Sequence, residues 1–461
     1  MRPVRRNLER ELKLRAPDGF ALPALPGEPL ESRVFVSSYR DSEDLRLARA
    51  GVTLRHRVEH GRGLWQLKLP RRDGRLEVEL AGGPRTVPQE IARLLVGLLR
   101  GRPLIEVARL RTRRSGVRVQ DDGRALADVT FDSVSVMEGQ RVTRTWEELE
   151  VELVDGDERA LARIEKDLRR AGAGKPESRT KLAQALDLEP EAEPAEPIAA
   201  ALRQQLDRLL AHDPGVRLGD DDEDVHQLRV ATRRLRAFLR AARPIVERDW
   251  AEDLRSELRW LTDSLALVRD LDVMIAHLRS ELEALEPAER AAFAPLAERL
   301  EAEREVARDE MLKTLGSDRY FALLDGLEQP PRLTGDASLR RLFRAEAKRL
   351  RRIGPDPGAA DEELHALRIK AKRARYAAEL AAPELGKTGE RFVGAAKRLQ
   401  DVLGEHQDAV VAEERIRALL KGTRATGAHL AAGRLVERQL ARRAAARAGL
   451  ASAWAEVERF S

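Results

Sequence analysis

The chain has 461 residues and a mass of 51.7 kDa, which is too much for a single hydrophobic core, so we expect two or more domains. Its 84 Lys and Arg residues nearly balance 79 Asp and Glu residues, and with 42% hydrophobic residues this balance excludes a mostly disordered chain. Zero cysteines exclude disulfides, thiol catalysis and thiolate metal sites, so any metal must be bound by oxygen or imidazole.

Two further observations restrict location and partners. The first seventeen residues lack an apolar stretch long enough for a signal peptide, and the sequence has no uninterrupted apolar run of bilayer length. We therefore expect a cytoplasmic protein with no membrane partner. Aromatic residues make up only 4% of the chain, which disfavours nucleic acid bound by base stacking.

Residues 1–187 read as mainly β, because short segments of alternating polarity are separated by Gly and Pro. Successive strand side chains point to opposite faces, so several segments place charged groups on one face and apolar groups on the other. The charged sets are Glu9, Glu11 and Lys13; Arg55 and Arg57; Glu77 and Glu79; Arg111 and Arg113; and Glu148, Glu150 and Glu152.

Two interpretations of these charged faces remain open. The first is an antiparallel sheet whose outer face is solvated. The second follows from two amphipathic helices, predicted from Pro88 and from Asp157, which could cover the apolar face from outside and leave the charges in a curved sheet or barrel. Such an interior would suit a polyanion bound with Mg²⁺ or Mn²⁺, with carboxylates on the metal and Arg or Lys on phosphate oxygens.

The segment Glu9-x-Glu11-x-Lys13 resembles the ExExK signature of the CYTH family, which includes triphosphate tunnel metalloenzymes. Arg55 and Arg57, then Lys68, the RLRTRR run, the ELEVEL strand and Lys181 follow in the family's order. The resemblance implies an eight-stranded antiparallel β tunnel that hydrolyses or forms P–O–P bonds. It assigns phosphate binding to Lys13, Arg55, Arg57, Lys68, Arg111, Arg113 and Lys181. It assigns the binding of metal and the orientation of water to Glu9, Glu11, Glu150 and Glu152. It assigns catalysis to the same four residues together with Lys13.

A Pro- and Glu-rich linker at 188–197 separates this half from an all-α half at 198–461. A second break at Pro330 and Pro331 divides the helical half into copies at about 198–327 and 336–461. The copies repeat each other, because His226 matches His365 139 positions later, and Asp270 matches Asp408 138 positions later. The sequence therefore predicts two duplicated four-helix bundles related by a pseudo-twofold axis.

Each copy carries a basic stripe at helical spacing. The stripes are His226, Arg229, Arg233 and Arg236 in the first copy and His365, Arg368, Lys372 and Arg375 in the second. Arg234 lies beside the first stripe, and Lys370 and Arg373 lie beside the second. For one helix, a solvated basic face paired with neighbouring acids would be the ordinary interpretation; repetition at a fixed offset favours an anion site instead. The acidic run at 220–224 is expected to favour the helix start.

The duplicated stripe with a later Asp-containing helix resembles the CHAD domain, a helical domain often fused behind CYTH. The resemblance covers about residues 198–461 and implies a basic central surface that binds inorganic polyphosphate. The second copy departs from it by having Gln407 where the first has Arg269.

Three functions are compatible with these features. The leading hypothesis is a metal-dependent inorganic triphosphatase whose helical domain binds polyphosphate. The alternatives are a non-catalytic polyphosphate-binding scaffold associated with polyphosphate granules, and a nucleic-acid-binding protein. The acidic set favours catalysis, because a pure anion binder has little use for carboxylates at its site.

Overall fold

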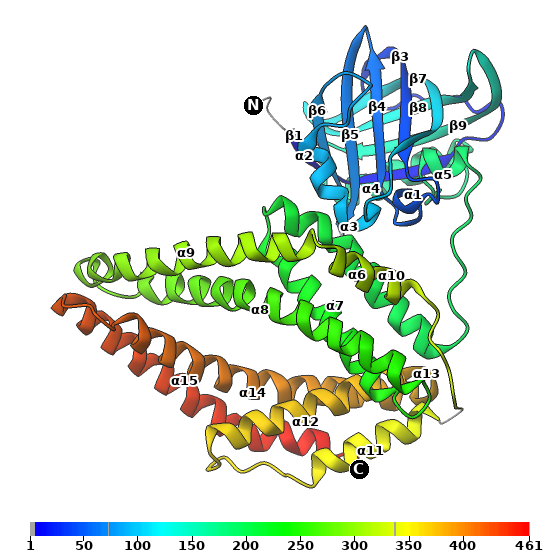
Figure 1. Cartoon of the computed structure of the whole chain (residues 1–461). Helices are drawn as coiled ribbons and strands as arrows, with labels where there is room; N and C mark the ends of the chain where they lie inside the picture. Colours follow the sequence, from blue (N-terminus) through cyan, green and yellow to red (C-terminus); the bar gives the residue numbers. More distant parts are fainter. Residues whose placement is uncertain (1–4, 72, 336–337, 461) are drawn as a thin grey trace. The chain divides into compact units, whose positions relative to one another are not determined.

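The computed structural model describes residues 5–71, 73–335 and 338–460. The chain divides into two compact units, Met1–Ala192 and Glu193–Ser461, and each is described by itself (Figure 1). The first unit is built on an antiparallel sheet and the second is helical, which confirms the predicted fold class.

The sheet of the first unit has nine antiparallel strands in the order β1-β6-β5-β4-β3-β7-β8-β9-β2. The strands are β1 (Arg5–Glu9), β2 (Glu11–Arg15), β3 (Gly27–Asp41), β4 (Thr53–Glu59), β5 (Arg62–Arg71), β6 (Gly74–Ala81), β7 (Ile105–Asp121), β8 (Arg124–Glu138) and β9 (Arg141–Leu153).

The two ends of this strand order meet at one residue. β1 pairs with β6 and β2 pairs with β9, yet β1 and β2 are consecutive in the chain with Arg10 alone between them. The carbonyl oxygen of Arg10 accepts a hydrogen bond of 2.9 Å from the Leu153 amide. The strand count therefore differs from the expected eight only because the first strand is interrupted at Arg10. The sheet curls until its first and last strands adjoin.

Helices cover the apolar outer face of this curled sheet, as the second interpretation predicts. Ile164 and Leu168 of α4 (Glu158–Arg170) pack with Leu14, Val129 and Val151 from three strands. The side chain of Asp157 begins α4 by accepting a hydrogen bond of 2.9 Å from the Ala160 amide.

The other predicted helix, near residue 88, is divided into three short pieces. These are α2 (Gln89–Ala92), η1 (Arg93–Leu95) and α3 (Val96–Leu99). Ile91, Leu94 and Leu95 in them are fully buried, as the amphipathic pattern predicts. The remaining helices of the unit are α1 (Arg46–Arg49) and α5 (Lys181–Ala185).

The second unit contains the long helices of the repeat. They are α6 (Pro197–Leu218), α7 (Asp222–Ala241), α8 (Arg248–Glu283), α9 (Pro287–Leu315), α10 (Asp318–Glu328), α11 (Leu339–Arg351), α12 (Asp361–Leu380), α13 (Ala382–Leu385), α14 (Lys387–Leu419) and α15 (Thr426–Glu458). One hydrophobic core runs through both copies.

The packing of these helices follows the predicted duplication. In the first copy α6, α7, α8 and α9 contact one another in succession, and in the second copy α11, α12, α14 and α15 do the same (Figure 1). The copies contact each other where α7 meets α12 and where α9 meets α15. The acidic run lies at the start of α7, where the Asp221 side chain accepts a hydrogen bond of 2.8 Å from the Glu223 amide.

Across the described parts of the chain, none of the helices combines the length and the apolar character that crossing a bilayer requires.

Candidate functional site

The curled sheet encloses a cavity of about 240 Å³ whose lining is almost entirely polar and charged. Eight cationic and six acidic side chains line it, supplied by strands from all parts of the sheet and by α5. Its charged lining consists of Lys13, Arg33, Arg55, Arg57, Lys68, Arg75, Arg114, Lys181, Glu9, Glu11, Glu77, Glu79, Glu150 and Glu152. The charges of the alternating strands therefore face inward.

All the sheet residues predicted for the site line this cavity except two. Arg111 and Arg113 are exposed on the opposite face of β7, and the expectation that they face the site is wrong. Leu110 and Thr112 are buried, so the even-numbered side chains of this part of β7 face inward, and Arg114 lies in the cavity. The sequence argument missed Arg114, and it also missed Arg33 and Arg75.

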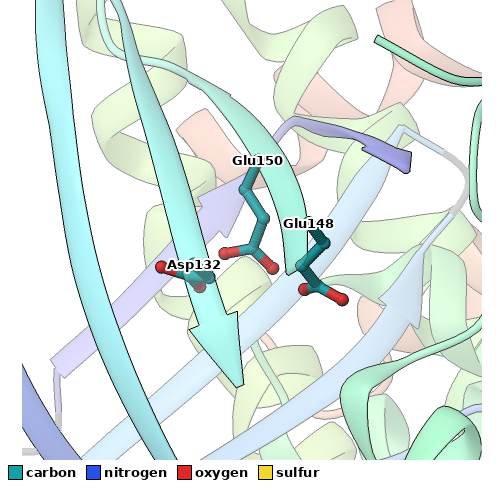
Figure 2. Close-up of side chains that lie close together, drawn as sticks. All are labelled: Asp132, Glu148 and Glu150. Atoms are coloured by element: carbon teal, nitrogen blue, oxygen red, sulfur yellow. The ribbon is translucent and has the colours of Figure 1, made fainter. Parts of the chain in front are cut away.

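Three carboxylates from two neighbouring strands lie together, and one of them, Glu150, lines the cavity. Asp132 of β8 pairs in register with Glu148 of β9, and Glu150 follows two residues later on the same face (Figure 2). Their oxygens lie within 4.8 Å of one another, which is close enough for a shared cation. Asp132 and Glu148 are buried, so the charge of this cluster must be compensated inside the protein.

Two cationic side chains supply that compensation. The Lys181 Nζ atom lies 2.5 Å from Glu148, 2.7 Å from Glu150 and 3.0 Å from Asp132. Arg114 donates to both oxygens of Asp132 at 2.7 and 2.6 Å and to Glu150 at 2.5 Å. Burial opposes ionisation of Glu150, but Lys181, Lys13 and Arg114 outweigh it and hold the pKa of that carboxyl well below its usual range.

The short helix α5 fixes Lys181 in this position. The Thr180 side chain caps α5 by accepting a hydrogen bond of 3.1 Å from the Ala183 amide. Gln184 donates to Glu148 at 2.8 Å, and Leu182 packs with Tyr39, Leu110 and Val134. Lys181 is therefore held from both its backbone and its charged end.

A second carboxylate group lies where the ends of the sheet meet. Glu11 pairs in register with Glu152, which places two like charges directly opposite each other. Burial raises the pKa of Glu152 to about 7, and repulsion from Glu9 and Glu11 adds to the effect. Burial also raises the pKa of Glu9 to about 7, against the attraction of Lys68 and in line with a hydrogen bond to Glu77. Burial and, for Glu152, repulsion from Glu9 and Glu11 therefore make these carboxyl groups hold their protons more readily than an exposed glutamate does.

The cations that face these carboxylates are held by neutral or acidic partners. Arg55 donates to Gln66 at 2.8 Å and to Tyr39 at 3.3 Å. Lys68 pairs with Glu9 and lies 3.6 Å from Glu77. Burial disfavours the charge on Lys68, but Glu77, Glu11 and Glu9 outweigh it and raise its pKa.

Arg57 is less completely balanced. It pairs with Glu59 and lies over the ring of Phe35, 4.0 Å from its centroid. Burial lowers its pKa, and the charge of Arg55 lowers it further, which an incoming anion would reverse.

These two carboxylate groups differ in their capacity for metal. The three carboxylates of the Asp132 cluster already face three cations, Lys181, Arg114 and Lys13, and the ammonium of Lys181 lies among them. Glu9, Glu11 and Glu152 offer oxygen donors whose mutual repulsion a cation would relieve, which is the donor chemistry of Mg²⁺ and Mn²⁺. Glu9, Glu11 and Glu152 thus fit a divalent metal.

In the helical unit, the two predicted stripes converge. Lys372 of α12 is surrounded by arginines of both copies, and burial together with Arg368, Arg233, Arg375 and Arg229 lowers its pKa to about 7. We call Arg229, Arg233, Arg368, Lys372 and Arg375 the basic cluster. The Nε atoms of Arg229, Arg233 and Arg368 are buried and have no hydrogen-bond partner within the described residues, so the cluster has unused donors for an anion.

Three other stripe residues lie outside the basic cluster. Arg236 faces Arg255 and Arg259 of α8, and burial followed by their charges lowers its pKa, against the pull of Asp263. His365 is exposed and its Nδ1 lies 2.9 Å from the Gln407 side chain. Burial and Arg269 lower the pKa of His226. The structure therefore brings together five of the eight stripe residues.

The acidic positions of the repeat also meet equivalent partners. Arg229 contacts Asp270 at 2.6 Å, and in the second copy the charge of Arg368 acts on Asp408, whose pKa burial raises. The offsets found in the sequence thus correspond to equivalent contacts in space.

Comparison with known proteins agrees with this division of the chain. A family model described as the CYTH domain matches residues 7–185, and one described as the CHAD domain matches residues 200–417. The uncharacterised protein Rv2226 of Mycobacterium tuberculosis is 33% identical over 471 residues, covering 90% of this chain and 89% of that protein.

Solved structures resemble parts of the chain. PptA from Streptomyces chartreusis has 25% identity and a TM-score of 0.47, covering 57% of this chain and 99% of that one. The CHAD domain from Ricinus communis has 27% identity and a TM-score of 0.45, covering 57% and 93%. HpAC1 from Hippeastrum, described as having a dominant triphosphatase activity, has 17% identity and a TM-score of 0.25, covering 39% and 95%.

Proposed function

The chain belongs to the family of proteins in which a CYTH domain precedes a CHAD domain, and from that premise we propose that it is a metal-dependent inorganic triphosphatase whose helical unit binds inorganic polyphosphate. The observation that carries this proposal is the coexistence, in one cavity, of several buried cations and a carboxylate group in which burial and mutual repulsion raise the pKa of Glu152. A site built only to bind anions would gain nothing from Glu9, Glu11 and Glu152.

Glu9, Glu11 and Glu152 would hold the Mg²⁺ or Mn²⁺ ion. When bound, such an ion neutralises phosphate charge and favours attack of water on phosphorus.

The chain's own cations would bind and orient the substrate. Arg55, Arg57 and Lys68 extend from β4 and β5 toward the carboxylates and would take phosphate oxygens, which stabilises the charge that develops on the leaving group. Phe35 beneath Arg57 keeps water from one side of that guanidinium and strengthens its attraction for phosphate.

Glu150, Arg114 and Lys181 would act differently from the assignment that the family resemblance implies. Their charges are engaged with one another and with Asp132, so they would hold the wall of the cavity in place. Lys13 lies 3.3 Å from Glu150 and 3.6 Å from Glu11, and it would join this wall to the metal-binding carboxylates.

The basic cluster supports the second half of the proposal. Five cations gathered from two helices without enough acidic partners cost free energy until a polyanion binds. A flexible chain of phosphates can contact several of them together and release its own counterions, so that binding would weaken as salt increases.

The decisive experiment measures phosphate release from tripolyphosphate by the full chain, with EDTA and with added Mg²⁺ or Mn²⁺. Release should require metal, and Glu11→Gln should lower it at least about 100-fold while the circular dichroism spectrum stays unchanged. A second measurement compares polyphosphate binding of the wild type with a variant that has Ala at Arg229, Arg233, Arg368 and Lys372. Binding without any turnover would instead make the protein a polyphosphate-binding scaffold.

A further inference from the structure

The pseudo-twofold relation makes two contacts between α7 and α12 equivalent. Positions 234 and 373 correspond at an offset of 139 residues, and positions 240 and 379 correspond at the same offset. The contact of 234 with 379 and that of 240 with 373 are therefore two copies of one packing arrangement. The residues at these positions differ in charge.

At the first contact the charges are opposite. Arg234 of α7 lies 3.3 Å from Glu379 of α12, and Arg375 also lies 3.3 Å from Glu379. At the second contact both residues are cations, Arg240 and Arg373. Burial lowers the pKa of Arg240, and the charge of Arg373 lowers it further. One copy of the contact is thus an ion pair and the other is a pair of repelling guanidinium groups.

The repelling pair lines a pocket of about 510 Å³ between the end of α7, α11 and α12. Arg243, Arg349 and Lys370 add to its basic rim, and Glu346 is its one acidic lining residue. Glu346 pairs with Arg349, and Arg243 lies 2.7 Å from Glu252. Within the described residues, Arg240, Lys370 and Arg373 have no ion-pair partner.

Apolar side chains also line this pocket. Pro244, Leu342 and Ala345 offer a bound anion no competing hydrogen-bond donors or acceptors. Phosphate oxygens match the forked donors of Arg better than other common anions do.

We propose that this pocket is a second anion site, separate from the basic cluster, which binds a short chain of phosphoryl groups. Two sources share that chemistry: a free triphosphate, and one end of a long polyphosphate whose remainder lies on the basic cluster. The site does not depend on hydrolysis by the sheet unit, because none of its residues belongs to that unit.

The test uses hydrogen exchange of the full chain in EDTA, which reports on α11 separately from the sheet unit. The phosphate chain that binds, tripolyphosphate or long-chain polyphosphate, should slow exchange in residues 339–351 of the wild type. Arg373→Ala should raise the half-saturating concentration about tenfold, the loss expected for one charge-assisted hydrogen bond. Arg344→Ala, at an exposed position of α11 outside the pocket, is the matched control and should leave the half-saturating concentration unchanged.

The variant Arg240→Glu gives the sharpest form of this test. It recreates at the second contact the ion pair of the first, so its melting temperature should equal or exceed that of the wild type while protection of α11 is lost. Protection that persists in a folded Arg240→Glu protein, or no protection of wild-type α11 by any phosphate chain, would overturn the proposal.

The two sources of ligand are distinguished in the combined variant Arg233→Ala, Lys372→Ala. If a free triphosphate is the ligand, tripolyphosphate still protects α11 in that variant. If the end of a long chain is the ligand, only long-chain polyphosphate protects α11 in the wild type, and the protection disappears in the variant.

Discussion

The Nζ atom of Lys181 lies 2.7 Å from Oε1 of Glu150, inside the sheet unit. Burial opposes the charge on Lys181, yet Glu148, Glu150 and Asp132 raise its pKa well above its ordinary value. Together with Arg114 and Lys13, this lysine compensates the three carboxylates, whereas Glu9 and Glu152, whose pKa values are raised, lie elsewhere in the cavity.

Removing the charge of Lys181 should destabilise the sheet unit. Lys181→Met leaves three buried carboxylates with one cation fewer, and a loss of about 3–5 kcal/mol is expected for breaking a buried pair from one side. Urea unfolding followed by hydrogen exchange of β8 and β9 measures it. Lys166→Met, on the exposed face of α4, is the control and should change stability by less than about 0.5 kcal/mol. Equal stability of the two variants would contradict the compensated cluster.

The metal-free sheet unit should lose stability as pH rises. The pKa of Glu152 is raised from 4.5 to about 7, so the folded chain holds a proton that the unfolded chain releases above about pH 4.5. Its contribution to stability is complete below that pH and is lost progressively up to about pH 7.

Measuring the free energy of unfolding at about pH 5 and at about pH 8 gives the slope of stability against pH and checks this expectation. Glu152→Gln should reduce the slope, and it should also stabilise the metal-free protein at the higher pH because it removes the repulsion from Glu11 across the strand pair. The same variant should lose metal-dependent phosphate release. A slope that is identical in wild type and variant would show that Glu152 does not cause it.

Of two neighbouring arginines on β7, Arg114 should be important for phosphate release and Arg113 should not. Arg114→Lys keeps the charge but removes the forked contact with Asp132, and it should lower kcat/KM for tripolyphosphate about tenfold or more. Arg113→Lys changes an exposed residue on the outer face and should stay within about twofold. Equal losses in the two variants would contradict the inward-facing phase assigned to β7.

Polyphosphate affinity should rise as pH falls through neutrality, and Lys372 should be a main cause. Its pKa of about 7 in the free protein leaves it partly neutral near that pH, and a bound polyanion favours the ammonium form. Binding therefore takes up a proton. Binding isotherms at fixed salt should show that Lys372→Arg keeps the affinity and loses most of the pH dependence.

The histidines give a competing source for the same pH dependence. The imidazole of a model compound titrates in an overlapping range, near a pKa of about 6.5. The double variant His226→Gln, His365→Gln should keep most of the pH dependence, because His365 is exposed and bonded to Gln407 and neither ring belongs to the basic cluster. Complete loss in that variant would assign the dependence to the imidazoles.

The sequence was sufficient for the two kinds of unit and the duplication, because each produces a periodic pattern over many residues. The alternation of charge along the strands was equally visible, but by itself it left open whether the charged face points inward. The phase of β7 was not readable, since that strand carries arginines on both faces at 111, 113 and 114. Its neighbour offered the missing signal. Asp132 alternates with apolar Val129 and Phe131 of the opposite face of β8, and an inward acid on β8 favours a cation opposite it at Arg114.

The role of Lys181 was not readable from the sequence for a different reason. The family pattern places it among phosphate-binding residues, and only the folded chain shows that Asp132, about fifty residues away along the sequence, shares its surroundings. The two stripes likewise converge on Lys372 because of the way in which α7 packs against α12. The repeat predicts that the two copies are related by symmetry, but it does not predict that packing. Glu379 and Arg240 then break that symmetry in a way that the repeat itself does not indicate.

The interruption of the first strand at Arg10 has a consequence for the order of events during synthesis. Glu9 pairs with Arg75 on β6, whereas Glu11 pairs with Glu152 on β9. Residues only two positions apart therefore pair with strands that leave the ribosome at very different times. Until β9 emerges, β2 is an unpaired edge, and a nascent chain with such an edge is open to aggregation. Glu9, Glu11 and Glu152, for which we propose metal binding, can therefore come together only after the whole sheet has been translated, so an incomplete chain would lack the proposed site.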